Sequence, residues 1–137
     1  MRHKRDLALW IAFHYLGTPY SWGGDDFTFD CSGFVIEILK SVGMLPREGD
    51  WTAAQLALRW PRSRSGKGNL VFWENEAEKI IHVEMCIGAG LAIGASGGGS
   101  QTTSLAAAIR HNAFVKIRPI NSRPNVWGFV DPFAEVT

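Results

Sequence analysis

The chain has 137 residues, of which 46% are hydrophobic and 20% charged, and its formal net charge is +1. This composition is typical of an ordinary globular protein, and the length fits a single domain over residues 1–137. The balanced charge gives no basis for binding nucleic acid, which requires a clustered basic surface. Because no run of about 18 apolar residues is present, we predict no membrane-spanning helix.

The first part of the chain has the periodicity of helices. Apolar residues recur at helical spacing over residues 6–15, and Gly17 favours a helix end there. A loop follows, and a second helical periodicity begins at Cys31 and stops before Gly43. Asp30 stands directly ahead of it, where a helix cap is expected. Cys31 is therefore expected in the first turn of a helix.

The rest of the chain favours short strands. Thr52 is placed to cap one more short helix, which runs through Leu58, and the polar segment 62–67 is expected to be a loop. After it we expect strands at 70–73, 82–87, 91–95, 114–117 and 126–130, and a short helix at 105–110. Helices first and then an antiparallel sheet predict the α+β class.

Cys31 is the residue best placed for nucleophilic chemistry. The chain has two cysteines, Cys31 and Cys86, too few to imply a disulfide framework. A cysteine attacks as its thiolate, and the dipole and unpaired N–H groups of a helix N-terminus favour that charge. We therefore expect a lowered pKa for the Cys31 thiol, whereas Cys86 is expected to pack in the core. His82, at the start of a predicted strand, is the candidate general base.

Four stretches of the sequence resemble the motifs of the NlpC/P60 cysteine peptidases. They are Gly-Thr-Pro-Tyr-Ser-Trp-Gly-Gly at 17–24, Asp-Cys-Ser-Gly-Phe-Val at 30–35, Gly-Asn-Leu-Val-Phe-Trp at 68–73 and His-Val-Glu-Met-Cys-Ile-Gly at 82–88. The family usually has Asp where Asn69 stands. The resemblance runs from about residue 5 to 130, and the first two stretches are its most specific part.

The resemblance implies a papain-like α+β fold, with N-terminal helices packed on an antiparallel β-sheet. It also implies hydrolysis of amide bonds in the stem peptides of bacterial peptidoglycan, typically the bond from D-γ-glutamyl to a diamino acid. The family roles make Cys31 the nucleophile and His82 the base. Tyr20, Asp30 and Ser32 match positions that line the site, where they recognise the amine end of the peptide or orient the intermediate.

Two positions near His82 depart from the family pattern. The family normally has a third polar residue, often His, on the strand after the base, where this chain has Gly94. Glu84 stands where the family usually has Gly. Residues two apart on a strand point to the same face, and the predicted hairpin brings Gly94 near Glu84. We therefore expect Glu84 to complete the catalytic residues by orienting His82, with Ser96 as a second candidate.

Each candidate residue also has a purely structural explanation. Cys31 could be a small buried hydrophobic residue and His82 a structural histidine. Tyr20 could be a packed loop aromatic, Asp30 only a helix cap, Ser32 only a first-turn residue and Glu84 a solvated strand residue. His3, His14 and His111 belong to no motif and are expected to be surface or helix residues.

Three functions remain open from the sequence. They are a peptidoglycan endopeptidase, a catalytically weak or silent NlpC/P60-fold structural module of a phage particle, and a related thiol amidase or acyltransferase. Cys31, His82 and Cys86 do not form a spaced zinc set, so we expect no metal or other cofactor. Peptidoglycan stem peptides and phage structural proteins are the candidate partners.

The N-terminal segment bears on where the protein acts. Residues 1–15 are basic but lack the long apolar core and the Ala-x-Ala site of a secretory signal. We therefore expect a protein made in the cytoplasm that reaches the cell wall by export, by lysis or as part of a phage particle.

Overall fold

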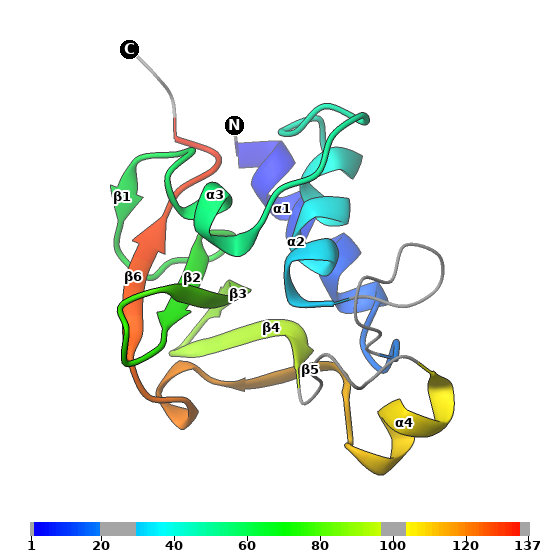
Figure 1. Cartoon of the computed structure of the whole chain (residues 1–137). Helices are drawn as coiled ribbons and strands as arrows, with labels where there is room; N and C mark the ends of the chain where they lie inside the picture. Colours follow the sequence, from blue (N-terminus) through cyan, green and yellow to red (C-terminus); the bar gives the residue numbers. More distant parts are fainter. Residues whose placement is uncertain (1, 20–29, 97–103, 135–137) are drawn as a thin grey trace.

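The N-terminal helices pack on one face of a β-sheet (Figure 1). The computed structural model describes residues 2–19, 30–96 and 104–134. Its helices are α1 (Arg2–His14), α2 (Cys31–Ser41), α3 (Ala53–Ala57), α4 (Leu105–Arg110) and the 3-10 helix η1 (Ile120–Ser122). None of these described helices is long and apolar enough to cross a membrane.

Six strands in the described residues form one sheet with the order β1-β6-β2-β3-β4-β5. They are β1 (Arg62–Ser63), β2 (Leu70–Glu74), β3 (Ile80–Gly88), β4 (Leu91–Ser96), β5 (Phe114–Pro119) and β6 (Val126–Val130). All neighbouring strands are antiparallel. The predicted α+β class is confirmed, and so is the hairpin between the third and fourth strands.

Several element bounds differ from the prediction by one or two residues, and two differences are larger. Helix α1 begins at Arg2, four residues earlier than expected, because the first turns are polar and show no apolar periodicity. They are held instead by Arg5, whose guanidinium donates to both carboxylate oxygens of Asp131 at 2.9 and 3.0 Å. Strand β1 falls in the segment expected to be a loop, since two residues paired with β6 are too short to show a strand pattern.

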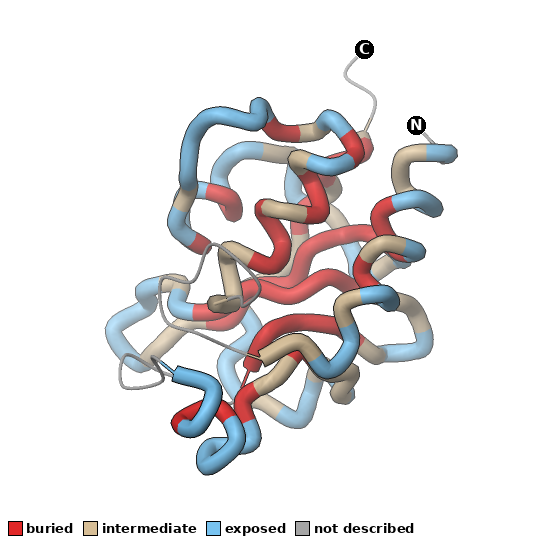
Figure 2. Tube along the Cα trace, turned by 90° about the vertical axis from the view of Figure 1, so that its right-hand side faces the viewer, coloured by how far each residue is buried: buried red, intermediate tan, exposed pale blue. Residues whose placement is uncertain are grey.

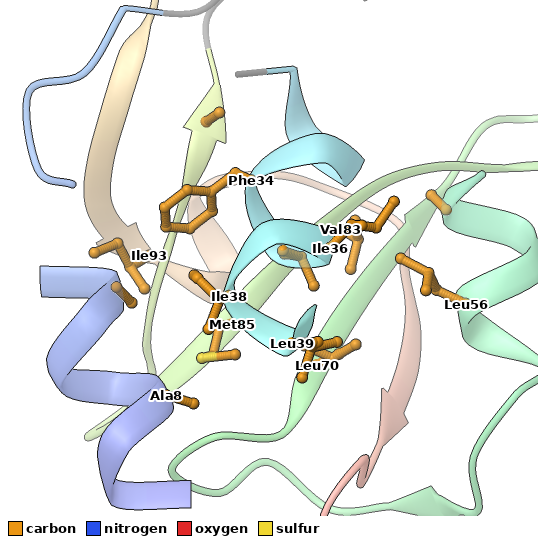
Figure 3. Packing of buried hydrophobic residues seen from close by; sticks show 14 of the residues in the cluster. Ala8, Phe34, Ile36, Ile38, Leu39, Leu56, Leu70, Val83, Met85 and Ile93 are labelled. Atoms are coloured by element: carbon orange, nitrogen blue, oxygen red, sulfur yellow. The ribbon is translucent and has the colours of Figure 1, made fainter. Parts of the chain in front are cut away.

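Helix α2 is fixed at its start by a cap and along its length by apolar contacts. Asp30 accepts a hydrogen bond from the Gly33 N–H at 2.7 Å, which confirms the predicted cap. Phe34, Ile38 and Leu39 are fully buried against the sheet, where Figure 3 shows them beside residues of β2, β3 and β4. Each such side chain contributes about 1.5–3 kcal/mol by leaving water. The first turn, which holds Cys31, is therefore anchored on β3.

Buried residues run along the middle strands (Figure 2), and side chains on both faces of these strands are buried. The main core lies between the sheet and helices α1 and α2. A smaller cluster on the other face consists of Val71, Trp73, Cys86 and Ala92. Cys86 is 1% exposed within it, so its predicted place in the core is confirmed.

Asn69 shows why an amide is suited to a position where the family usually has Asp. Its Oδ1 accepts from the Arg5 guanidinium at 2.7 Å, and its Nδ2 donates to the Arg64 carbonyl at 2.9 Å. A carboxylate has no hydrogen to offer that carbonyl. The side chain therefore joins α1 to the segment between β1 and β2.

Candidate active site

Cys31 opens into a pocket at the start of α2. It is the first residue of that helix, is half-buried and has a free thiol. The pocket has a volume of about 420 Å³. Its walls come from three parts of the chain: the cap and first turn of α2 (Asp30, Cys31 and Ser32), the segment before α3 with the start of that helix (Asp50, Trp51, Thr52, Ala53 and Gln55), and the start of β3 (Ile80 and Ile81). The thiol is therefore within reach of a bound molecule.

The expected lowering of the Cys31 pKa is wrong. Burial raises the pKa of this thiol to about 11, and the negative charges of Asp30 and Glu84 raise it further. Backbone hydrogen bonds from Val83 and Ser32 oppose the rise but do not outweigh it. Loss of water around the sulfur thus exceeds the help of the helix start. The resting thiol is neutral, so it needs a base during attack.

His82 is a buried residue held by a carboxylate. The residue is 5% exposed and lies on β3, where it pairs with Trp73 of β2. The ring Nε2 lies 2.6 Å from Oε2 of Glu84, itself buried. Burial lowers the pKa of His82 below its usual value, although the hydrogen bond and charge of Glu84 raise it and the charges of Arg123 and Arg118 lower it. The ring is therefore neutral at neutral pH and able to take a proton.

The structure places Cys31 next to Val83, the residue that follows His82 on β3. The backbone hydrogen bond between Cys31 and Val83 places the thiol against β3. Val83 faces α2 in the main core, whereas His82 shares its side of the sheet with its partner Trp73. Both Cys31 and His82 are described, and no hydrogen bond joins them here. Catalytic hydrogen bonds are often long or poorly aligned in unliganded sites and form fully when substrate binds.

The other predicted site residues have different outcomes. Asp30 and Ser32 line the pocket beside Cys31. Glu84 contacts His82 as expected. Ser96 is 2% exposed, and its hydroxyl makes no hydrogen bond in the described structure. Tyr20 lies outside the described residues. Of the two candidates for orienting the base, only Glu84 forms a hydrogen bond with it in the described structure.

Two groups of residues near the site were not found by sequence reasoning. One is the pocket wall before and within α3, especially Asp50, Trp51 and Gln55. The other is the pair Arg118 and Arg123, whose charges act on His82 from β5 and from the segment before β6. Neither group belongs to a motif, and both are brought close only by tertiary folding. Thr52, which was singled out as a cap, was the one signal in that region.

Cys31 is expected to react with iodoacetamide faster than Cys86. The pKa of each thiol is raised to about 11, so acidity does not separate them. Access does, since Cys31 lines the pocket and Cys86 is 1% exposed. Labelling for short times followed by peptide mapping measures both, and the rate at Cys31 should rise with pH up to about 11. Faster modification of Cys86 in the folded protein would contradict the assignment.

The site residues do not form a metal centre within the parts of the chain described. Over residues 2–19, 30–96 and 104–134, no group of three or more His, Cys, Asp or Glu side chains could hold an ion. The close pair His82 and Glu84 has no third partner of that kind there.

Comparison with known proteins gives the family of the chain. The NlpC/P60 family profile matches residues 17–119. A gamma-D-glutamyl-L-lysine dipeptidyl-peptidase of Bacillus subtilis (strain 168) is 41% identical over 81 residues, which cover 56% of this chain and 27% of that protein. The chain thus spans about a quarter of that relative's length.

Solved structures give the same result for the fold. An NlpC/P60 family protein from Bacillus cereus has a TM-score of 0.74 and 27% identity, covering 95% of this chain and 40% of that one. The NlpC/p60 domain of the peptidoglycan hydrolase SagA has a TM-score of 0.69 and 25% identity, covering 93% and 97%. The papain-like α+β fold is confirmed, and the chain belongs to the NlpC/P60 family.

Proposed function

We propose that this chain is a cysteine peptidase that hydrolyses amide bonds in the stem peptides of bacterial peptidoglycan, at the bond from D-γ-glutamyl to a diamino acid. The observation that carries the proposal is the half-buried Cys31 thiol, which opens into a pocket beside the strand that holds His82. The B. subtilis relative is named for a gamma-D-glutamyl-L-lysine substrate. That name supports the choice of bond.

The protonation states suit a base-assisted attack. In the proposed reaction the two side chains come together when substrate binds, and the neutral thiol then gives its proton to the free nitrogen of neutral His82 while sulfur bonds to the substrate carbonyl carbon. The carbonyl oxygen becomes an oxyanion, and the Cys31 N–H at the helix start is placed to stabilise it. His82 returns the proton to the leaving amine. Water, deprotonated by the same ring, then releases the acyl group and restores the thiol.

The pocket favours a substrate with a positive charge. Asp30 and Asp50 contribute carboxylates to its wall, and the described residues that line it include no Lys, Arg or His. Trp51, Ile80 and Ile81 supply apolar surface beside them. A stem peptide offers both a free amine and an aliphatic side chain on its diamino acid. The charge and shape of the wall thus support such a peptide over an anionic amide.

Digestion of purified peptidoglycan tests the proposal. The chain is expected to release fragments whose masses place the cut after D-γ-glutamate, as read by mass spectrometry, and Cys31→Ala is the matched negative control. Peptidoglycans with lysine and with diaminopimelate should be compared, since each of these diamino acids offers an amine to the acidic wall of the pocket. No release by a folded wild type would instead support a silent structural module, and cuts at another amide would indicate a different thiol amidase.

A further inference from the structure

Glu84 and Gly94 compete for one volume on the sheet. Met85 pairs with Ile93, so Glu84 and Gly94 are the next residues along β3 and β4 and point to the same face. A Cβ added at Gly94 would overlap Cγ of Glu84 and lie 2.8 Å from its Cδ and 3.0 Å from its Cβ. Gly94 has no positive φ, so its backbone does not itself require glycine. Its lack of a side chain leaves room for Glu84.

The contact made by Glu84 determines which nitrogen of His82 can act. An ionised carboxylate only accepts hydrogen bonds, so the proton of a neutral ring in this pair lies on Nε2, 2.6 Å from Oε2. The other nitrogen, Nδ1, then keeps its lone pair. Both residues are about 95% buried, so water competes little for this bond. The geometry therefore fixes the tautomer that a base needs.

We propose that Glu84 is the positioning residue of His82, and that glycine at position 94 is the condition for it. The holding group is thus supplied by the strand of the base itself, two residues on, and the neighbouring strand provides only the space. This inference rests on the proposed function, because the proposed function gives His82 the role of base. Ser96, buried on β4, does not share the task, since its hydroxyl makes no hydrogen bond in the described structure.

Charged and titratable groups from several elements act on this pair. Arg118 and Arg123 act on His82, and the charge of Glu84 acts on Lys116 of β5, on Cys31 of α2 and on Cys86 of β3. The positive groups oppose protonation of the ring, and Glu84 favours it. Removing the carboxylate therefore lowers the pKa of His82, and the acid limb of the pH–rate profile moves to lower pH.

NMR titration of the four histidines, combined with kinetics, tests the proposal. In Glu84→Gln the pKa of His82 should fall, and kcat should drop by about tenfold or more with little change in KM, since ring orientation is lost rather than substrate contact. Gly94→Ala should give the same changes with Glu84 still present, because its Cβ displaces that side chain. Glu76→Gln, an exposed glutamate in the turn before β3, is the matched control and should change neither.

A reciprocal exchange separates positioning from mere packing. In the double variant with Glu84→Gly and Gly94→Glu, the carboxylate moves to β4, from which a long side chain reaches the diagonal neighbour His82. It should recover activity and a raised pKa of His82 above either single variant. An unchanged His82 titration in both Glu84→Gln and Gly94→Ala overturns the inference, as does a loss of activity with Ser96→Ala alone. A wild type that cleaves nothing refutes the proposed function, and the titration still decides whether Glu84 holds the ring.

Discussion

Replacing Cys31 with alanine is expected to lower the rate of stem-peptide cleavage by roughly 10⁴-fold or more, on the scale of a removed covalent nucleophile. The substitution takes away the sulfur that forms the acyl intermediate. The neighbouring Ser32 lines the same pocket, but its hydroxyl is a far weaker nucleophile without a base of its own. The kcat of a γ-D-glutamyl-diamino acid peptide, followed by chromatography, measures the change.

The matched control for that experiment is the second cysteine. Cys86→Ala removes a thiol that is 1% exposed and does not line the pocket, so activity should stay within a few-fold of wild type while stability falls slightly. Cys31→Ala protein that is folded by circular dichroism and still cleaves at the wild-type rate would show that another group is the nucleophile. The two variants together separate loss of chemistry from loss of fold.

Most of the fold was predictable because local signals agreed with tertiary packing. Helix α2 has a cap at Asp30, a buried apolar stripe and a stop at Gly43, and it begins at the predicted residue. Helix α4 and strand β6 also have their predicted bounds. What could not be predicted was β1, whose two residues pair with a strand more than 60 positions away.

The site was predictable where residues lie close along one strand. His82 and Glu84 are two apart on β3, so their shared face followed from strand geometry, and the structure records their contact. The pKa of Cys31 was predicted in the wrong direction because the helix start is a local feature, whereas burial comes from β3 packed against it. The pocket wall at Asp50 and Trp51 depends on a loop position that no periodicity sets.

His82→Ala is expected to lower kcat by about 10²- to 10⁴-fold, the usual cost of losing a general base. The Cys31 thiol is neutral with a pKa of about 11, so without the ring only the small fraction already ionised can attack. His3→Ala, which removes an exposed histidine of α1, is the control and should keep the wild-type rate. A folded His82→Ala protein with full activity would remove His82 from the mechanism.

The pH dependence of the same two proteins gives a sharper test than the rate alone. In the wild type, the ring stops accepting protons only when the pH falls through the pKa of His82, which burial lowers. The acid limb should therefore lie below pH 6.5, the ordinary value for histidine. In His82→Ala that limb should disappear, and the residual rate should rise steadily with pH as the thiol ionises, up to about pH 11. An acid limb that persists at the same pH in His82→Ala would mean that a different group titrates, and the thiol would then have to lose its proton to that group.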